Sequence, residues 1–296
     1  FPPALLESMQ QNFITSFQMP AGHDIGPKLL AEFPNLTIVD TGSLMNQIQH
    51  VIDQVVADAI AAKQVPGAVV VVGRGDRIVY RKAYGHQALA PKPEPMTLDT
   101  IFDMASVTKV VATTTAVMAL VEDGKIRLVD PVASFIPEFG KYGKDRVTVR
   151  HLLTHMSGLR PDLDLGDPWI GHDEAIRLAS EEVLTQAPNT RFVYSDINFF
   201  LLGDIVQRIS GQSLDAYLKA RVFGPLGMTE TGYLPPKTLL PRIAPTERCA
   251  EQDAWPCKRP NVEPLRGVVH DPTARRMGGM AGHAGLFSTA HDLQLF

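Results

Sequence analysis

A serine and a lysine one helical turn apart are the residues of this chain best suited to nucleophilic chemistry. Ser106 and Lys109 form the only Ser-x-x-Lys sequence among the 296 residues. A serine hydroxyl is a weak nucleophile until a base takes its proton, and residues three apart on a helix share one face. Burial disfavours the charged form of a lysine and lowers its pKa, which suits Lys109 to that task. At a helix start, the backbone N–H of Ser106 would also help to hold an oxyanion.

A second polar cluster, Tyr194-Ser195-Asp196, precedes an amphipathic segment. A tyrosine beside a cationic lysine ionises more easily, so Tyr194 could accept the proton of Ser106. Asp196 could form an ion pair with Lys109 or orient a substrate amide. The structural alternative is a core tyrosine followed by a helix-capping aspartate, and the residues alone leave both interpretations open.

The elements that must position these side chains begin with a helix and a hairpin. Apolar residues recur at helical spacing over 44–64 and predict an amphipathic helix. The segments 68–72 and 77–84 are rich in β-branched residues and are joined by the turn sequence Gly75-Asp76, which predicts two antiparallel strands. A helix followed by a hairpin is typical of an antiparallel sheet with helices packed on it.

The segment that begins at Ser106 is predicted to lie at the centre of the fold. Residues 106–122 are apolar nearly all round, which is typical of a buried helix and argues against an incidental lysine at an ordinary helix start. A further helix is predicted over 197–209, with Gly211 as its stop. Residues 233–280 form a long proline-rich stretch, and loops of that length are more often functional than idle. The sequence therefore predicts an α/β fold, with an antiparallel sheet flanked by helices, a mostly helical region, and Ser106 at the cleft between them.

Together the motifs resemble the serine β-lactamase-like family, which includes class C β-lactamases, DD-peptidases and related esterases. The resemblance covers residues 44–296 and implies a β-lactamase/transpeptidase-like fold. Two segments are most similar to the branch that contains penicillin-binding protein 4B, namely Val269-His270-Asp271 and Gly282-His283-Ala284-Gly285-Leu286-Phe287-Ser288. The other segments that carry the resemblance are Ser106–Lys109, His151–Leu159, Tyr194–Asp196 and Phe223–Met228.

The resemblance implies roles for four residues. Ser106 would be the acylated nucleophile, Lys109 would share its proton, and Tyr194 would act as general base and acid. Asp196 would bind the substrate, but most class C enzymes carry Asn there, so their contact with a substrate amide does not carry over. The implied reaction is hydrolysis of a D-Ala-D-Ala-type peptide, a β-lactam or a small ester, with no cofactor and no metal. The alternative is a non-catalytic binding module for peptidoglycan fragments or a partner protein.

The family has a third element, Lys-Thr-Gly or His-x-Gly, on a strand well after the tyrosine element. His283-Ala284-Gly285 matches its letters but precedes a typical Ser-Thr-Ala-x-Asp-Leu helix start, so we interpret His283 as structural or loop-forming. The third element and the last strands of the sheet are therefore expected to be missing from this chain. We expect an N-terminal extension over residues 1–40 and an incomplete β-lactamase-like domain over 41–296.

Composition narrows the remaining function classes. The net charge of −4 offers no basic surface for nucleic acid, and no apolar run approaches the roughly 20 residues that span a bilayer.

His151 and His155 have the spacing of some zinc ligands, but no third ligand is evident, so a structural role is expected. Cys249 and Cys257 would form a disulfide in an oxidising compartment or stay as two thiols. The family, and a first residue Phe1 in place of Met, favour a periplasmic or secreted bacterial protein.

Overall fold

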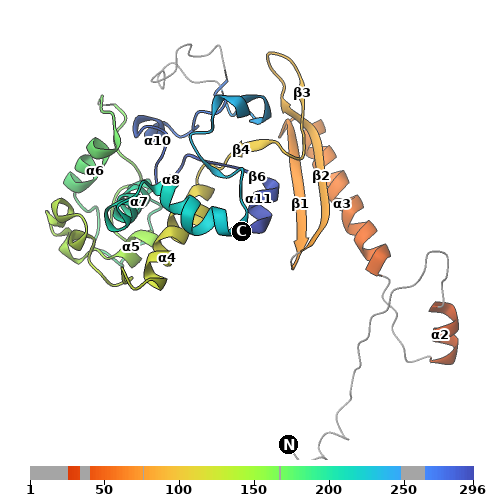
Figure 1. The fold of residues 1–296 in the computed structure, drawn as a ribbon, viewed down its shortest axis with the longest axis horizontal. Coiled ribbons are helices and arrows are strands. Elements are labelled where there is room, and N and C mark those ends of the chain that lie inside the picture. The colour runs from red at the N-terminus through yellow and green to blue at the C-terminus, as the bar shows by residue number, and fades with distance from the viewer. Residues whose placement is uncertain (1–25, 34–40, 76, 167, 248–263) are drawn as a thin grey trace, which may run out of the picture. The chain divides into compact units, whose positions relative to one another are not determined.

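The fold is that of a computed structural model, which describes residues 26–33, 41–75, 77–166, 168–247 and 264–296 (Figure 1). The chain divides into two compact units, residues 1–53 and 54–296. Helix α2 (Gly26–Glu32) belongs to the first unit, and α3 (Thr41–Ala61) begins there and ends in the second. Because the division falls inside α3, the domain start at residue 41 stays a prediction.

Two antiparallel sheets of three strands each form the strand part of the second unit, with the orders β1-β2-β3 and β4-β6-β5. The predicted hairpin is present, in the register that pairs Val70 with Lys82. Helix α11 (Ala290–Leu295) follows β6 directly and packs against β1 (Figure 1). The strands are β1 (Gly67–Arg74), β2 (Arg77–Ala88), β3 (Glu94–Pro95), β4 (Ile101–Asp103), β5 (Gly232–Tyr233) and β6 (Leu286–Thr289).

A helical region makes up most of the rest of this unit, and its buried side chains form one large apolar cluster. The predicted combination of an antiparallel sheet with a mostly helical region is thus confirmed. The α-helices are α4 (Thr115–Glu122), α5 (Val149–Leu153), α6 (His172–Glu181), α7 (Asp196–Ser210), α8 (Leu214–Leu218), α9 (Gly224–Leu226) and α10 (Pro272–Arg276). Short 3₁₀ segments lie at Val132–Ser134, Pro137–Gly140, Lys144–Arg146 and Lys237–Arg242, and π-helical segments at Lys109–Thr114 and Lys219–Phe223.

The predicted helix over 106–122 is central but not uniform. Residues Lys109–Thr114 are π-helical and continue into α4 without a break. Ala112, Val117 and Leu120 are completely buried, which confirms the central position. The expectation of a regular helix is wrong over the π-helical segment, because apolar spacing does not distinguish i→i+4 from i→i+5 bonding. Such wide turns occur frequently at functional sites.

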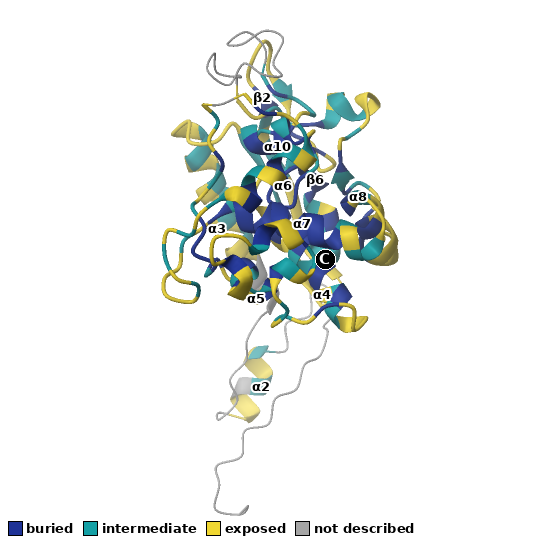
Figure 2. Ribbon diagram, turned by 90° about the vertical axis from the view of Figure 1, so that its left-hand side faces the viewer, coloured by how far each residue is buried: buried dark blue, intermediate teal, exposed yellow. Residues whose placement is uncertain are grey.

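Helix α7 is the most deeply buried element of the helical region, and Figure 2 shows it largely in the dark blue of buried residues. Its observed bounds, Asp196–Ser210, lie within one residue of the predicted 197–209. Gly211 ends it as predicted, with φ +69° and its N–H bonded to the Gln207 carbonyl oxygen. A left-handed residue in this place costs glycine little, which explains the stop. The first turn of α7 carries Asp196 toward the serine.

The predicted loop-rich stretch 233–280 is only partly described. Its described residues include Tyr233 of β5, a 3₁₀ segment at Lys237–Arg242 and the short helix α10. Cys249 and Cys257 lie outside the described residues, so the alternatives of a disulfide and two thiols both stay open. Among the residues that the structure describes, none of the helices has the length and apolar character needed to span a bilayer.

Candidate active site

Ser106 lies at an exposed turn between β4 and the π-helical segment. Ala105, just before it, has a φ of +44°, a left-handed conformation that costs a residue with a Cβ about 1 to 2 kcal/mol. The Asp103 carboxylate holds this turn by accepting the N–H of Ala105 at 2.8 Å and that of His270 at 2.6 Å. Burial raises the pKa of Asp103, and the two N–H donors only partly oppose it. The strained turn thus presents the Ser106 hydroxyl at the surface on a fixed backbone.

Lys109 is buried directly beside that hydroxyl, with 3% of its surface exposed. Its Nζ donates to Ser106 Oγ at 2.9 Å and to the His283 carbonyl oxygen at 3.2 Å. Asp196 Oδ1 lies 2.6 Å from the same nitrogen. That contact falls outside hydrogen-bond angles, so we treat it as an ion pair. The two hydrogen-bond acceptors and the carboxylate of Asp196 together fix the position of the ammonium group next to the serine.

Tyr194 contributes its ring to the site rather than its hydroxyl. Lys109 Nζ lies 4.8 Å from the centroid of the Tyr194 ring, a cation–π contact. The tyrosine is 45% exposed, and no hydrogen bond joins its hydroxyl to the described residues. The structure therefore brings Tyr194 to Lys109, as the sequence predicts, without the direct contact to Ser106 that its predicted role as base requires.

The ring of Tyr194 packs against the ring of His155. The two rings lie 4.5 Å apart between centroids, and His155 Nδ1 accepts the backbone N–H of Ser195 at 3.1 Å. Burial lowers the pKa of His155, and the charge of Lys109 lowers it further. His151 instead closes a capping box with Thr148 at the start of α5. Both histidines thus have structural contacts, and no pattern in the sequence indicates that His155 lies against the Tyr194 ring.

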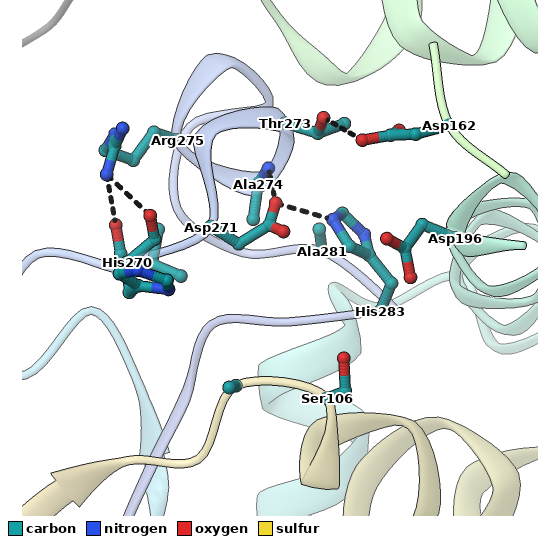
Figure 3. Close-up of polar contacts among 12 residues, drawn as sticks. Ser106, Asp162, Asp196, His270, Asp271, Thr273, Ala274, Arg275, Ala281 and His283 are labelled. Carbon is teal, nitrogen blue, oxygen red and sulfur yellow. Dashed lines mark hydrogen bonds and ion pairs between the residues drawn. The ribbon is translucent and has the colours of Figure 1, made fainter. Parts of the chain in front are cut away.

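A buried carboxylate–imidazole pair lies just above Ser106 (Figure 3). His283 is fully buried, and its Nε2 lies 2.9 Å from Asp271 Oδ1. Burial acts to raise the pKa of Asp271, but the hydrogen bond and charge of His283 lower it to about 2. His283 is interpreted from the sequence as structural, and these contacts agree with that. The sequence gives no sign that its backbone carbonyl would reach Lys109.

Asp162 is a further carboxylate that the sequence analysis missed. It accepts the Thr273 hydroxyl at 2.7 Å and the N–H of Leu163 at 2.8 Å, and burial raises its pKa. It belongs to the same polar cluster as Asp271 (Figure 3). In the described part of the chain, no three His, Cys, Asp or Glu side chains are arranged to hold a metal ion.

This architecture recurs in a known structure. An octameric penicillin-binding protein homologue from Pyrococcus abyssi superposes with a TM-score of 0.65 and 28% identity, over 87% of this chain and 55% of that one. The fold is thus that of the penicillin-recognising serine hydrolases. A sequence model of the β-lactamase family matches residues 52–296, and the chain belongs to that family. The family and the fold predicted from the sequence are therefore confirmed.

Two curated relatives have names that describe cell-wall chemistry. The N-acetylmuramyl-L-alanine amidase of Bacillus subtilis (strain 168) is 33% identical, over 95% of this chain and 67% of its own length. A putative D-alanyl-D-alanine carboxypeptidase of Escherichia coli (strain K12) is 32% identical, over 77% of this chain and 58% of its own length. The chain thus spans between 58% and 67% of the length of these relatives.

Proposed function

We propose that Ser106 is the nucleophile of a serine hydrolase that forms an acyl-enzyme, with Lys109 as the group that takes the serine proton. The observation that carries the proposal is the 2.9 Å contact between Lys109 Nζ and Ser106 Oγ, with the amine also held by a hydrogen bond to His283 and an ion pair with Asp196. Once the amine has lost a proton, the same contact lets it accept the hydroxyl proton. Asp196 serves in this proposal as the partner of Lys109 and lines the substrate site beside it.

The proposed reaction has two steps. First, Ser106 Oγ bonds to the substrate carbonyl carbon as its proton passes to Lys109. The bond to the leaving nitrogen or oxygen then breaks, and the leaving group takes up a proton. Second, a water molecule attacks the ester on Ser106, releases the acid and restores the hydroxyl. The Ser106 N–H would stabilise the negative oxygen in both steps, since it lies at the start of a helix.

We infer that the substrate is an amide of alanine in peptidoglycan-derived material. The names of both curated relatives describe hydrolysis of such a bond, in one case to N-acetylmuramic acid and in the other between two D-alanines. β-Lactams and small esters present the same kind of carbonyl carbon and are proposed as alternative substrates. Action in the periplasm or outside the cell belongs to the same proposal, because peptidoglycan is located there.

The proposal is tested by covalent labelling of the full-length protein. Incubation with penicillin and with an activated ester is expected to leave one acyl group per chain, seen by intact mass and mapped to the peptide that contains Ser106. Muropeptides with and without a terminal D-Ala-D-Ala then separate the two amide substrates, through release of D-alanine or of a free lactyl carboxylate. A protein that turns over no substrate and carries no adduct on Ser106 would refute the proposal.

The role of Tyr194 is decided by two substitutions of different kinds. Tyr194→Phe keeps the ring that contacts Lys109 and His155 but removes the hydroxyl, whereas Tyr194→Leu removes both. If the phenol transfers protons, both variants lose acylation rate by about 10²- to 10⁴-fold, measured by stopped-flow with an activated ester. A near-normal rate in Tyr194→Phe together with a large loss in Tyr194→Leu would show that the ring alone matters.

A further inference from the structure

The position of Lys109 depends on a carbonyl group from an irregular part of the chain. Of the three groups that contact its amine, Ser106 is three residues earlier in the chain and the ion partner Asp196 belongs to the buried helix α7. The third, the His283 carbonyl oxygen, belongs to a segment with neither helix nor strand. Gly285, two residues further on, has a φ of +111°, and residue 283 takes part in no helix or strand hydrogen-bond pattern. Other contacts must therefore hold this carbonyl in place.

Contacts on both sides hold the segment. On the helix side, Thr113 in the π-helical segment donates its hydroxyl to the Gly282 carbonyl oxygen at 2.6 Å. Gly282 also packs so closely on the Phe199 backbone of α7 that a Cβ would lie 2.0 Å from its carbonyl oxygen. The Ala281 carbonyl oxygen accepts the Tyr233 hydroxyl at 3.3 Å. On the side of α10, the His283 side chain joins the segment to Asp271. The imidazole thus connects the Lys109 acceptor to a second fixed element.

Asp271, which holds the His283 side chain, is itself fixed by contacts within α10. It is the N-cap of α10, and Oδ1 accepts the Ala274 N–H at 2.7 Å as well as the His283 contact. Arg275 closes the turn by donating to the His270 carbonyl oxygen at 2.6 Å. Since the pKa of Asp271 is about 2, it stays ionised throughout the neutral range, where a charged acceptor strengthens the bond to the imidazole.

We propose that His283 and Asp271 form a positioning pair for the proposed reaction, in which the Asp271–His283 contact fixes the His283 carbonyl oxygen and thereby the Lys109 amine beside Ser106. Neither residue touches the substrate in this account. The inference rests on the proposed function of Ser106 and Lys109, and assigns a role to side chains that are remote from the bond being broken. The buried His283 Nδ1 has no hydrogen-bond partner among the described residues, so the Asp271 contact alone fixes the ring by hydrogen bonding.

The chain contains a control pair of the same kind outside the site. His172 Nε2 in α6 lies 3.0 Å from Asp204 Oδ1 in α7, and both side chains are mostly buried. None of the contacts described above for Ser106, Lys109 and His283 involves either residue. His172→Asn therefore removes a mostly buried histidine–carboxylate contact of similar length and leaves the contacts of Lys109 in place.

The first test measures acylation of Ser106 in the full-length protein. In His283→Asn the side chain is too short to reach Asp271, and the acylation rate is expected to fall by between about 10- and 100-fold, with KM nearly unchanged. His283→Gln places an amide nitrogen near the position of Nε2 and is expected to recover most of that loss. Asp271→Ser keeps a good N-cap for α10 but loses the contact with His283, and its acylation rate is expected to match that of His283→Asn. Wild-type rates in His283→Asn and Asp271→Ser, or no recovery in His283→Gln, would overturn the proposal.

The second test does not depend on catalysis. Competitive acetylation with acetic anhydride, followed by peptide mapping, reports how accessible the Lys109 amine is. Faster acetylation of Lys109 is expected in His283→Asn and Asp271→Ser than in the wild type or His172→Asn, and equal rates in all four contradict the positioning role. If the wild-type protein is not acylated at Ser106, the proposed function is refuted. The acetylation rates of Lys109 then still show whether Asp271 and His283 position its amine.

Discussion

Replacing Ser106 with alanine is expected to abolish the acyl-enzyme and to lower kcat/KM by about 10³-fold or more. The substitution removes the atom that bonds to the substrate carbonyl carbon, so no other group can take over the covalent step. The fold should persist, because Ser106 is exposed and its hydroxyl contacts only Lys109 among the described residues. The measurement is intact mass after incubation with penicillin or an activated ester, combined with steady-state kinetics.

A matched control for this variant is Thr115, the first residue of α4. Thr115→Ala removes a hydroxyl whose one hydrogen bond among the described residues is to the Val110 carbonyl oxygen, and it should leave acylation unchanged. The competing hypothesis, a non-catalytic binding module, makes the opposite prediction for Ser106→Ala. Under that hypothesis the wild type shows no turnover, and the variant binds peptidoglycan fragments with unaltered affinity.

Replacing Lys109 with methionine is expected to lower the acylation rate by about 10²- to 10⁴-fold, since the hydroxyl then loses the group proposed to accept its proton. Methionine has a similar length and no charge, so packing against the core is largely preserved. The change also leaves Asp196 without its cationic partner, and an uncompensated, mostly buried carboxylate should cost about 1 to 3 kcal/mol of folding stability. Urea unfolding measures the second effect independently of the first.

The double variant Lys109→Met/Asp196→Asn separates the two effects of this ion pair. Removing both charges should restore much of the lost stability, because the buried pair is replaced by two uncharged groups. The acylation rate should stay as low as in Lys109→Met, since no base is returned to the site. A double variant that regains the rate would show that Lys109 acts on stability alone and not on the proton of Ser106.

The central part of the site is predictable because it depends on local spacing. Residues three apart on a helix must share a face, so Ser106 and Lys109 are in contact in the structure at 2.9 Å. The ion pair of Asp196 with Lys109 is one of the two roles that the sequence offers for that residue, and the structure contains it. The β1–β2 hairpin and the buried helix α7 are likewise fixed by patterns of apolar residues over short stretches.

Features that depend on the backbone or on distant segments are not visible in such patterns. Any residue has a carbonyl group, so no residue type indicates that His283 would bond to Lys109 through its main chain. The positive φ of Ala105 is equally hidden, because alanine has no preference for that conformation. The ring contact between Tyr194 and His155 is hidden as well, because His155 is 39 positions earlier in the chain.

The π-helical turns at Lys109–Thr114 make the chemistry unusually sensitive to chain length. A π segment amounts to one residue inserted into an α-helix, and deleting one residue between 110 and 114 would let the helix regain ordinary winding. The reactive amine and hydroxyl would then swing by about 100° around the helix axis relative to the buried valines and leucines of α4. A chain shortened in this way would keep its core and its unfolding temperature, while its serine would face away from Tyr194. Deletion of a single residue would therefore remove reactivity without removing the fold.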